Sequence, residues 1–149
     1  MVISAMKDFA AAFKTIFEER NLTPEAEAAL QTRVAEYYQG SFLPKLADNS
    51  QTTPHFNDYF PNKESTQILQ DLYIANNPNQ LGSKHKFARA NDNSRYSDHH
   101  ARYHPVLRNF LEKFGYYDIF LIDIDTGHIV YSVFKEADYA TSLLTGPYA

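Results

Sequence analysis

Residues suited to binding or catalysis concentrate in one stretch of the chain, from Lys84 to Lys113. This stretch carries a net charge of +4, although the whole chain carries -4, and it holds four of the six histidines. A basic, hydroxyl-rich segment inside an acidic protein predicts a site for a small anion. A basic face that is simply solvated is the alternative interpretation.

The histidines in this stretch also suggest a metal site. His100 and His104 are four residues apart, so on a helix both would project from one side, with the spacing that zinc sites use. Asp98 and His99 could complete the ligand set, which makes a metal-binding protein or a metal-dependent hydrolase the alternative function. Pro105 argues against it, because a helix that opens at this proline leaves His104 at its edge. Surface or hydrogen-bonding histidines are the simpler interpretation.

Other kinds of chemistry have little support in the sequence. The absence of cysteine excludes disulfides, iron–sulfur clusters, thiol nucleophiles and cysteine-ligated zinc. Residues 123–127 begin like a calcium loop but lack its third ligand and terminal glutamate, and a hairpin turn explains them. No nucleophile–base pair or phosphate loop is present, so we expect neither an enzyme nor a cofactor. The net charge of -4 predicts no binding of nucleic acid.

Length and composition predict a single domain spanning residues 1–149. A hydrophobic content of 44% is enough for one compact core. No apolar run approaches the roughly 20 residues that a membrane-spanning helix needs, and the N-terminus lacks the apolar region of a secretory signal. We therefore expect a soluble chain, which is either cytoplasmic or separated from its targeting segment.

Residues 1–40 predict two helices in an antiparallel hairpin. The first has a coiled-coil-like stripe that either packs on its own domain or forms a dimer. The second begins with Thr23 as N-cap and Pro24 at the first helical position, and Gly40 is a plausible end. The stripe consists of Val2, Met6, Phe9, Phe13 and Ile16.

Residues 41–115 predict loops and shorter helices. The polar, proline-containing run 44–62 is typical of a loop, and a helix around Leu69 should end before Pro78. The run 76–103 has few aliphatic residues and is longer than an ordinary connection, so we expect a functional loop. A last helix should open at Pro105 and close at Gly115.

Residues 116–149 predict a β-hairpin followed by a C-terminal loop. Residues 116–123 and 128–135 are rich in aromatic and β-branched side chains, and residues 125–127 form a turn between them. Both strands are apolar on both faces, so the hairpin should lie in a larger sheet or between helices. A hairpin alone is only marginally stable.

Several long strings of the sequence resemble one receptor family. They fall in residues 69–84, 96–105, 114–121, 129–136 and 138–149, and the resemblance is strong over residues 68–149. In these strings the chain resembles the extracytoplasmic Cache-type, PAS-like sensory domains of methyl-accepting chemotaxis proteins and related cyclases and kinases. Two features of that family, the membrane spans and the further strands after residues 146–149, are missing here.

The resemblance implies an α+β fold in which long N-terminal helices pack on a PAS-like antiparallel sheet. It also implies a periplasmic ligand-sensing domain of an inner-membrane receptor, homodimeric in the full receptor and attached to the membrane through segments outside this sequence. Pockets in such domains lie between a sheet face and the preceding loop and helix. On this sequence that position nominates Tyr96, Arg102, Tyr103, His104, Arg108, Tyr117, Tyr131, Lys135 and Asp138 as ligand-binding residues.

Overall fold

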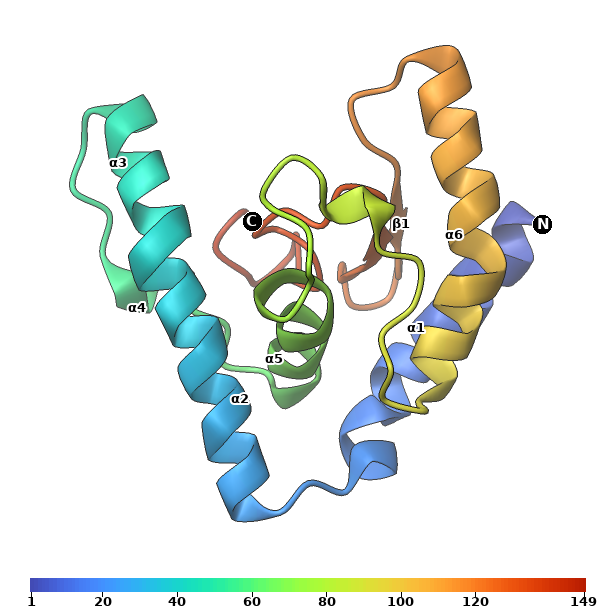
Figure 1. Ribbon diagram of the computed structural model, residues 1–149, viewed down its shortest axis with the longest axis horizontal. Coiled ribbons are helices and arrows are strands. Elements are labelled where there is room, and N and C mark those ends of the chain that lie inside the picture. Colours follow the sequence, from blue (N-terminus) through green and yellow to red (C-terminus); the bar gives the residue numbers. More distant parts are fainter.

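The computed structural model describes residues 1–149 and is mainly helical (Figure 1). Its longest helices are α1 (Val2–Arg20), α2 (Pro24–Tyr37) and α6 (Arg95–Phe114). The shorter helices are α3 (Leu43–Ser50), α4 (Phe56–Tyr59) and α5 (Glu64–Gln70), with π-helical turns η1 (Tyr38–Phe42) and η2 (Asp71–Ala75) and the 3-10 turn η3 (Lys84–Lys86). The strands are β1 (Phe120–Ile122) and β2 (Ile129–Ser132).

The predicted PAS-like sheet is wrong. Helices account for 57% of the chain, and the sheet consists of two antiparallel strands of three and four residues. The only further pairing is an isolated bridge between His128 and Ser142. The hairpin itself is confirmed, and β2 is completely buried because α1 packs against it. Helices thus provide the cover that additional strands would give in a PAS-like sheet.

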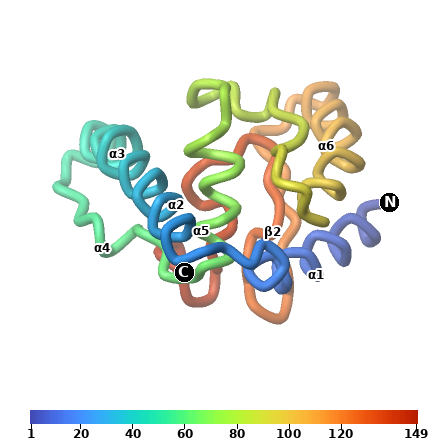
Figure 2. Tube along the Cα trace, turned by 60° about the horizontal axis from the view of Figure 1, so that its bottom comes forward, coloured from blue at the N-terminus to red at the C-terminus, as the bar shows by residue number.

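The first two helices do not form the predicted antiparallel hairpin. They diverge from the short link at residues 21–23, and α5 packs between them (Figures 1 and 2). Gln31 and Arg33 of α2 bind Gln67 and Asp71 at the α5–η2 helix, the latter through two hydrogen bonds of 2.7 and 2.9 Å. These polar contacts hold α2 on α5 and away from α1.

The start of α2 follows the prediction, but its end does not. Thr23 caps the helix by accepting a hydrogen bond of 3.1 Å from the Ala26 amide, and Pro24 follows. Gly40 does not stop the helix, because the backbone passes through η1 into α3 without leaving helical geometry. Pro44 lies inside this continuous helical run, where it lacks the amide proton that would bond to the preceding turn. Helices α3 and α4 make about half of the predicted loop 44–62 helical.

Helix α6 begins ten residues before the predicted start. Ser94 caps it by accepting a bond of 3.2 Å from the Ser97 amide, and Pro105 lies inside the helix. The predicted loop 76–103 is therefore helical from Arg95 onward. Gly115 ends the helix in a left-handed conformation, as expected.

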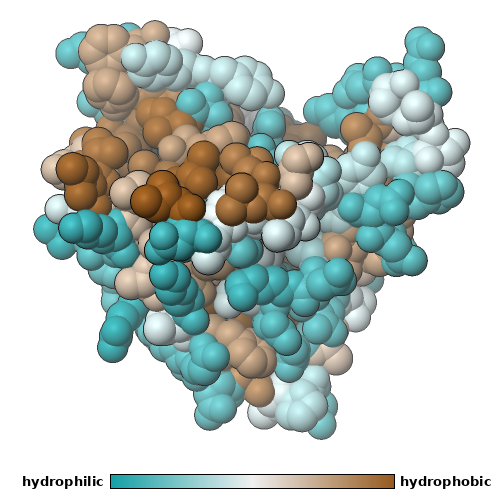
Figure 3. Space-filling model, turned by 180° about the vertical axis from the view of Figure 1, so that it is seen from behind, coloured by the Kyte–Doolittle hydropathy of each residue, from teal (hydrophilic) through white to brown (hydrophobic).

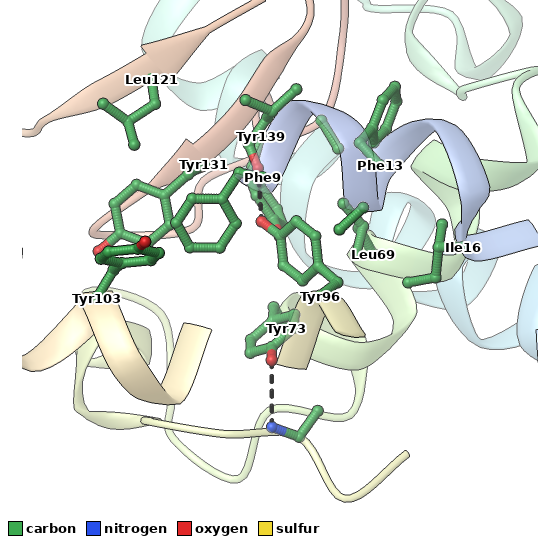
Figure 4. Packing of buried hydrophobic residues seen from close by; sticks show 14 of the residues in the cluster. Phe9, Phe13, Ile16, Leu69, Tyr73, Tyr96, Tyr103, Leu121, Tyr131 and Tyr139 are labelled. Carbon is green, nitrogen blue, oxygen red and sulfur yellow. Dashed lines mark hydrogen bonds between the residues drawn. The ribbon is translucent and has the colours of Figure 1, made fainter. Parts of the chain in front are cut away.

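The hydrophobic core lies where α1, α5, α6 and β2 meet. Phe9, Phe13 and Ile16 of the predicted stripe on α1 are buried there, so this part of the stripe packs on its own domain (Figure 4). Val2 at the start of the helix is exposed. Exposed hydrophobic side chains also gather on the face opposite to that of Figure 1 (Figure 3).

No helix of the structure combines the length and the apolar character that crossing a membrane requires.

Candidate functional site

Four of the nine nominated residues meet in the core. Tyr96 and His104 of α6 face Tyr131 of β2 and Lys135, which follows β2, and all four are at most 2% exposed. The Tyr131 hydroxyl lies 2.7 Å from Nδ1 of His104, and the Tyr96 hydroxyl donates to the Val130 carbonyl at 2.6 Å. The side chains therefore converge as predicted, but they fill the space between them.

The aromatic rings of this cluster continue into the rest of the core. The Tyr139 hydroxyl donates to that of Tyr96 at 2.5 Å, and Phe9 of α1 stacks on Tyr131 with ring centroids 4.8 Å apart (Figure 4). His100 stacks between Tyr73 and His104, at 4.4 Å from each. None of the three main surface cavities is lined by a nominated residue. The cluster is thus a packed polar core in this structure.

Of the other five nominees, Tyr103 is also buried in the core, where it packs on Phe9, and the remaining four lie apart from the cluster. Arg102 is exposed and stands over the ring of Tyr103, whose hydroxyl donates to Asp8 at 2.6 Å. Arg108 pairs with Glu112 one turn along α6 at 2.8 Å. Tyr117 is 83% exposed. Asp138 is half-buried, and burial together with the charge of Glu136 raises its pKa to about 6.

The alternative metal site does not form. Both ring nitrogens of His104 are engaged, with the Tyr131 hydroxyl and with the His85 carbonyl at 2.7 Å. Nδ1 of His100 lies 2.6 Å from the Ala88 carbonyl, and Asp98 pairs with Arg89. No group of three potential ligand side chains lies close enough to hold a metal ion. The histidines serve as hydrogen-bonding core residues.

Burial explains the protonation of the two core histidines. It lowers the pKa of His104 to about 3 and lowers that of His100 well below its ordinary value, and the nearby charge of Lys135 lowers both further. Both rings are therefore neutral at pH 7. This agrees with a structural role, in which each ring accepts or donates in the tautomer that its partner requires.

The main concave site of the structure lies elsewhere, in a cavity of about 650 Å³ that we call the polar cavity. One wall is formed by residues 57–66, from α4 to the first turn of α5, and the other by His128 and residues 141–147. Six of its thirteen lining residues carry hydroxyls or amides, and Lys63 and Asp58 are the charged groups. This composition suits a small polar molecule.

Each wall of the polar cavity is held by its own hydrogen bonds. Gln67 donates to the Pro61 carbonyl at 2.8 Å, and Phe60 packs on the ring of Tyr38. Opposite, Ser142 donates to the Thr126 carbonyl at 2.7 Å and accepts from the amides of residues 144 and 145. Thr66 donates to the Ala140 carbonyl at 2.7 Å and joins the two walls. The cavity is thus largely preformed.

Lys63 and Asp58 are the charged side chains of the polar cavity, and His128 adds a titratable ring. Burial lowers the pKa of His128, the charge of Lys63 lowers it further, and Asp123 acts in the opposite direction. Lys63 is exposed and belongs to none of the ion pairs in the structure. Nδ1 of His128 is buried without a hydrogen-bond partner. His128 is therefore neutral at pH 7, and Lys63 is the positive group that an anion in the cavity would meet.

The sequence predictions missed the polar cavity. Its walls come from residues about 80 positions apart, and both were assigned to connecting loops. The signals present were the polar run 57–63 and the turn at Gly146 and Pro147, which are typical of any surface loop.

Comparison of the chain with protein families, with curated proteins and with solved structures finds no match. The resemblance to Cache-type sensory domains remains a prediction from the sequence.

Proposed function

We propose that this chain binds a small anionic molecule in the polar cavity and acts as the sensory region of a bacterial chemotaxis-type receptor. The observation that carries the first part is the cavity itself. Its volume of about 650 Å³ lies within the range of small-molecule sites, roughly 300–1,000 Å³. The proposed receptor is a homodimer of the inner membrane, with this region in the periplasm. This sensory role is supported by the resemblance over residues 68–149.

The charge of the ligand follows from Lys63. Its ammonium is the one lysine or arginine group at the cavity, and hydrogen-bond donors of Asn57, Asn62 and Thr145 surround the same space. Asp58 faces the cavity as well and favours a ligand whose negative charge is confined to one end. A carboxylate of a few carbon atoms satisfies these conditions, because it presents one compact charge and accepts several hydrogen bonds.

A ligand in the polar cavity would act on two parts of the fold together. The wall 57–66 leads directly into α5, which packs against both α1 and α2. The wall 141–147 pairs with the start of β2, where the Ile129 amide donates to the Thr141 carbonyl at 2.9 Å. A molecule that prefers one spacing of the walls would shift the arrangement of α1 and α2, as a sensor requires.

Binding is tested with the purified chain at pH 7.5 and a panel of acetate, lactate, succinate, malate, aspartate and glutamate. We expect at least one of them to raise the melting temperature and to give saturable heat in calorimetry. Lys63→Gln should weaken that ligand about ten- to hundredfold, since a hydrogen bond to a charged group contributes about 1.5–3 kcal/mol.

Lys45→Gln is the matched control, because Lys45 is an equally exposed lysine on α3 and does not line the cavity. It should leave the dissociation constant unchanged. Absence of binding across the panel, or equal affinity of both variants, would contradict the proposal.

A further inference from the structure

Lys135 is an unusual lysine, because its amine is enclosed by the protein without a carboxylate partner. The residue is 1% exposed and belongs to none of the ion pairs of the structure. Its amine donates to the carbonyl of Ser132, three residues earlier in the chain. An ammonium group has three donors, so one carbonyl satisfies a third of its hydrogen-bonding capacity.

Aromatic rings supply the rest of the surroundings, and we call them the tyrosine box. The amine lies 4.4 Å from the ring centroid of Tyr131, 5.1 Å from that of Tyr139 and 5.8 Å from that of Tyr73. The ring faces attract a cation, but they replace only part of the hydration that a lysine has in water. Burial therefore disfavours the protonated amine, because part of its hydration is lost. The neutral amine fits the box without this desolvation cost.

The titratable groups that face Lys135 come from every element packed around it. They are Tyr73 of η2, His100 and His104 of α6, Asp118 before β1, Tyr131 of β2, and Tyr139. Asp118 is the sole acid among them, and its Oδ1 already accepts from the amides of Ile119, Val133 and Phe134. The surroundings thus contain little negative charge to balance a proton on the lysine.

The backbone that carries Lys135 is itself strained. Lys135 and Ala140 have φ angles of +59° and +67°, a region that side chains other than glycine seldom adopt. Gln70 holds the segment between them by donating to the carbonyls of Ala137 and Tyr139 at 3.1 and 2.8 Å, and Thr66 donates to the Ala140 carbonyl at its end. Immediately after Ala140 the chain forms the wall of the polar cavity.

We propose that Lys135 is a pH-sensitive switch, in which protonation inside the tyrosine box loosens the segment 135–140 and the cavity wall that follows it. Loss of the proton at higher pH lets the segment pack tightly. Acidification reverses this, because the charged amine then favours states in which the segment opens and the amine reaches water.

The proton of Lys135 can be followed separately from those of its neighbours. Burial lowers its pKa from 10.5 to about 7, while Asp118 acts in the opposite direction. Burial lowers the pKa values of His100 and His104, so the two histidines titrate at lower pH than Lys135. It raises the pKa values of the three tyrosines of the box, so these titrate at higher pH. Around pH 7 the box therefore changes charge through Lys135.

The first test is an NMR titration of the full chain labelled with ¹³C-lysine. We expect one Cε signal, assigned by its loss in Lys135→Met, to shift near pH 7, while those of exposed lysines shift above pH 10. The second test is urea unfolding at pH 6 to 10. The ratio of the unfolding constants of the wild type and of Lys135→Met should fall about tenfold for each pH unit between 7 and 10.

Lys7→Met is the control, since Lys7 is exposed on α1, and it should keep the pH dependence of the wild type. Hydrogen exchange should locate the effect, with amides of residues 135–142 protected less at pH 6 than at pH 9 after correction for intrinsic rates. The switch is refuted if the Lys135 signal titrates above pH 10. It is equally refuted if the two unfolding constants keep a fixed ratio across the pH range. If the variant does not fold, the Cε signal is assigned in the wild type by its nuclear Overhauser effects to the rings of the tyrosine box, and the titration of that signal decides alone.

Discussion

Replacement of Gln70 by methionine tests whether one side chain holds the segment 135–140 on the rest of the fold. Gln70 is 1% exposed and lies at the end of α5. Its amide nitrogen donates to the carbonyls of Ala137 and Tyr139, and its carbonyl accepts from the Tyr38 hydroxyl at 2.9 Å. Methionine has nearly the same shape, so the substitution removes three hydrogen bonds and leaves little empty space.

The expected loss of stability depends on the hydrogen bonds that each partner of Gln70 keeps after the substitution. The Tyr139 carbonyl loses its hydrogen bond from Gln70 and stays buried, which costs about 1–3 kcal/mol. The Tyr38 hydroxyl and the Ala137 carbonyl keep a weak mutual contact of 3.4 Å, so their loss is smaller. We therefore expect Gln70→Met to lower the free energy of unfolding by about 2–4 kcal/mol, a large part of the 5–15 kcal/mol typical of a domain.

Urea unfolding at pH 7.5, followed by tyrosine fluorescence and circular dichroism, measures this loss. With a slope of about 2 kcal/mol per molar urea, the middle of the usual range, the midpoint should fall by about 1–2 M. Gln80→Met is the control, because Gln80 is exposed in the loop after η2 and should shift the midpoint by less than about 0.3 M. A midpoint for Gln70→Met that equals the control value would refute the view that this side chain anchors the segment.

Three further predictions concern stability. Arg33→Met should lower the free energy of unfolding by about 1–2 kcal/mol in urea, because it leaves the buried carboxylate of Asp71 without its bidentate partner, although Arg33 itself is 41% exposed. Pro105→Ala should raise the melting temperature, since proline in a helix interior is about 3 kcal/mol less favourable than alanine; an unchanged value would mean that the tertiary contacts of α6 override this preference. The pKa of His104 is lowered from 6.5 to about 3, so the unfolded chain binds the proton first and stability should fall as the pH drops through this interval; His104→Gln should flatten that loss in acid unfolding curves.

The parts of the fold that the sequence predicts are those fixed by local chemistry. Thr23 and Pro24 define the start of α2 through a cap and a preset backbone angle, and neither needs a tertiary partner. Gly115 and the turn at Gly127 adopt positive φ angles that favour glycine. At Gly127 a side chain would also meet Leu144, with a Cβ only 2.6 Å from its Cγ, so the turn needs glycine for a second reason that the sequence does not reveal.

The errors arise where tertiary packing decides. Pro105 lies within α6 because one face of this helix is buried against α1 and β2 through Tyr96, His100 and Leu107. This packing offsets the backbone hydrogen bond that proline cannot form. The same stripe contains tyrosines and histidines in place of aliphatic residues, so its helical period escaped detection. At Gly40 the π-helical turn lets the chain continue, because Tyr38 packs against Phe42 and Phe60.

The candidate site shows why convergence of polar residues does not by itself predict a pocket. Four nominated residues do meet, but their own large side chains fill the space between them; they are Tyr96, His104, Tyr131 and Lys135. Their hydrogen bonds go to other protein groups and not to a cavity. A cavity forms instead between residues 57–66 and the C-terminal residues 141–147. The same core nevertheless borders that cavity, because the chain passes from Lys135 through Ala140 directly into its wall. The buried residues nominated as ligand contacts are thus placed to control the position of the wall, and the substitutions at Gln70 and Lys135 examine that control from two sides of the same segment.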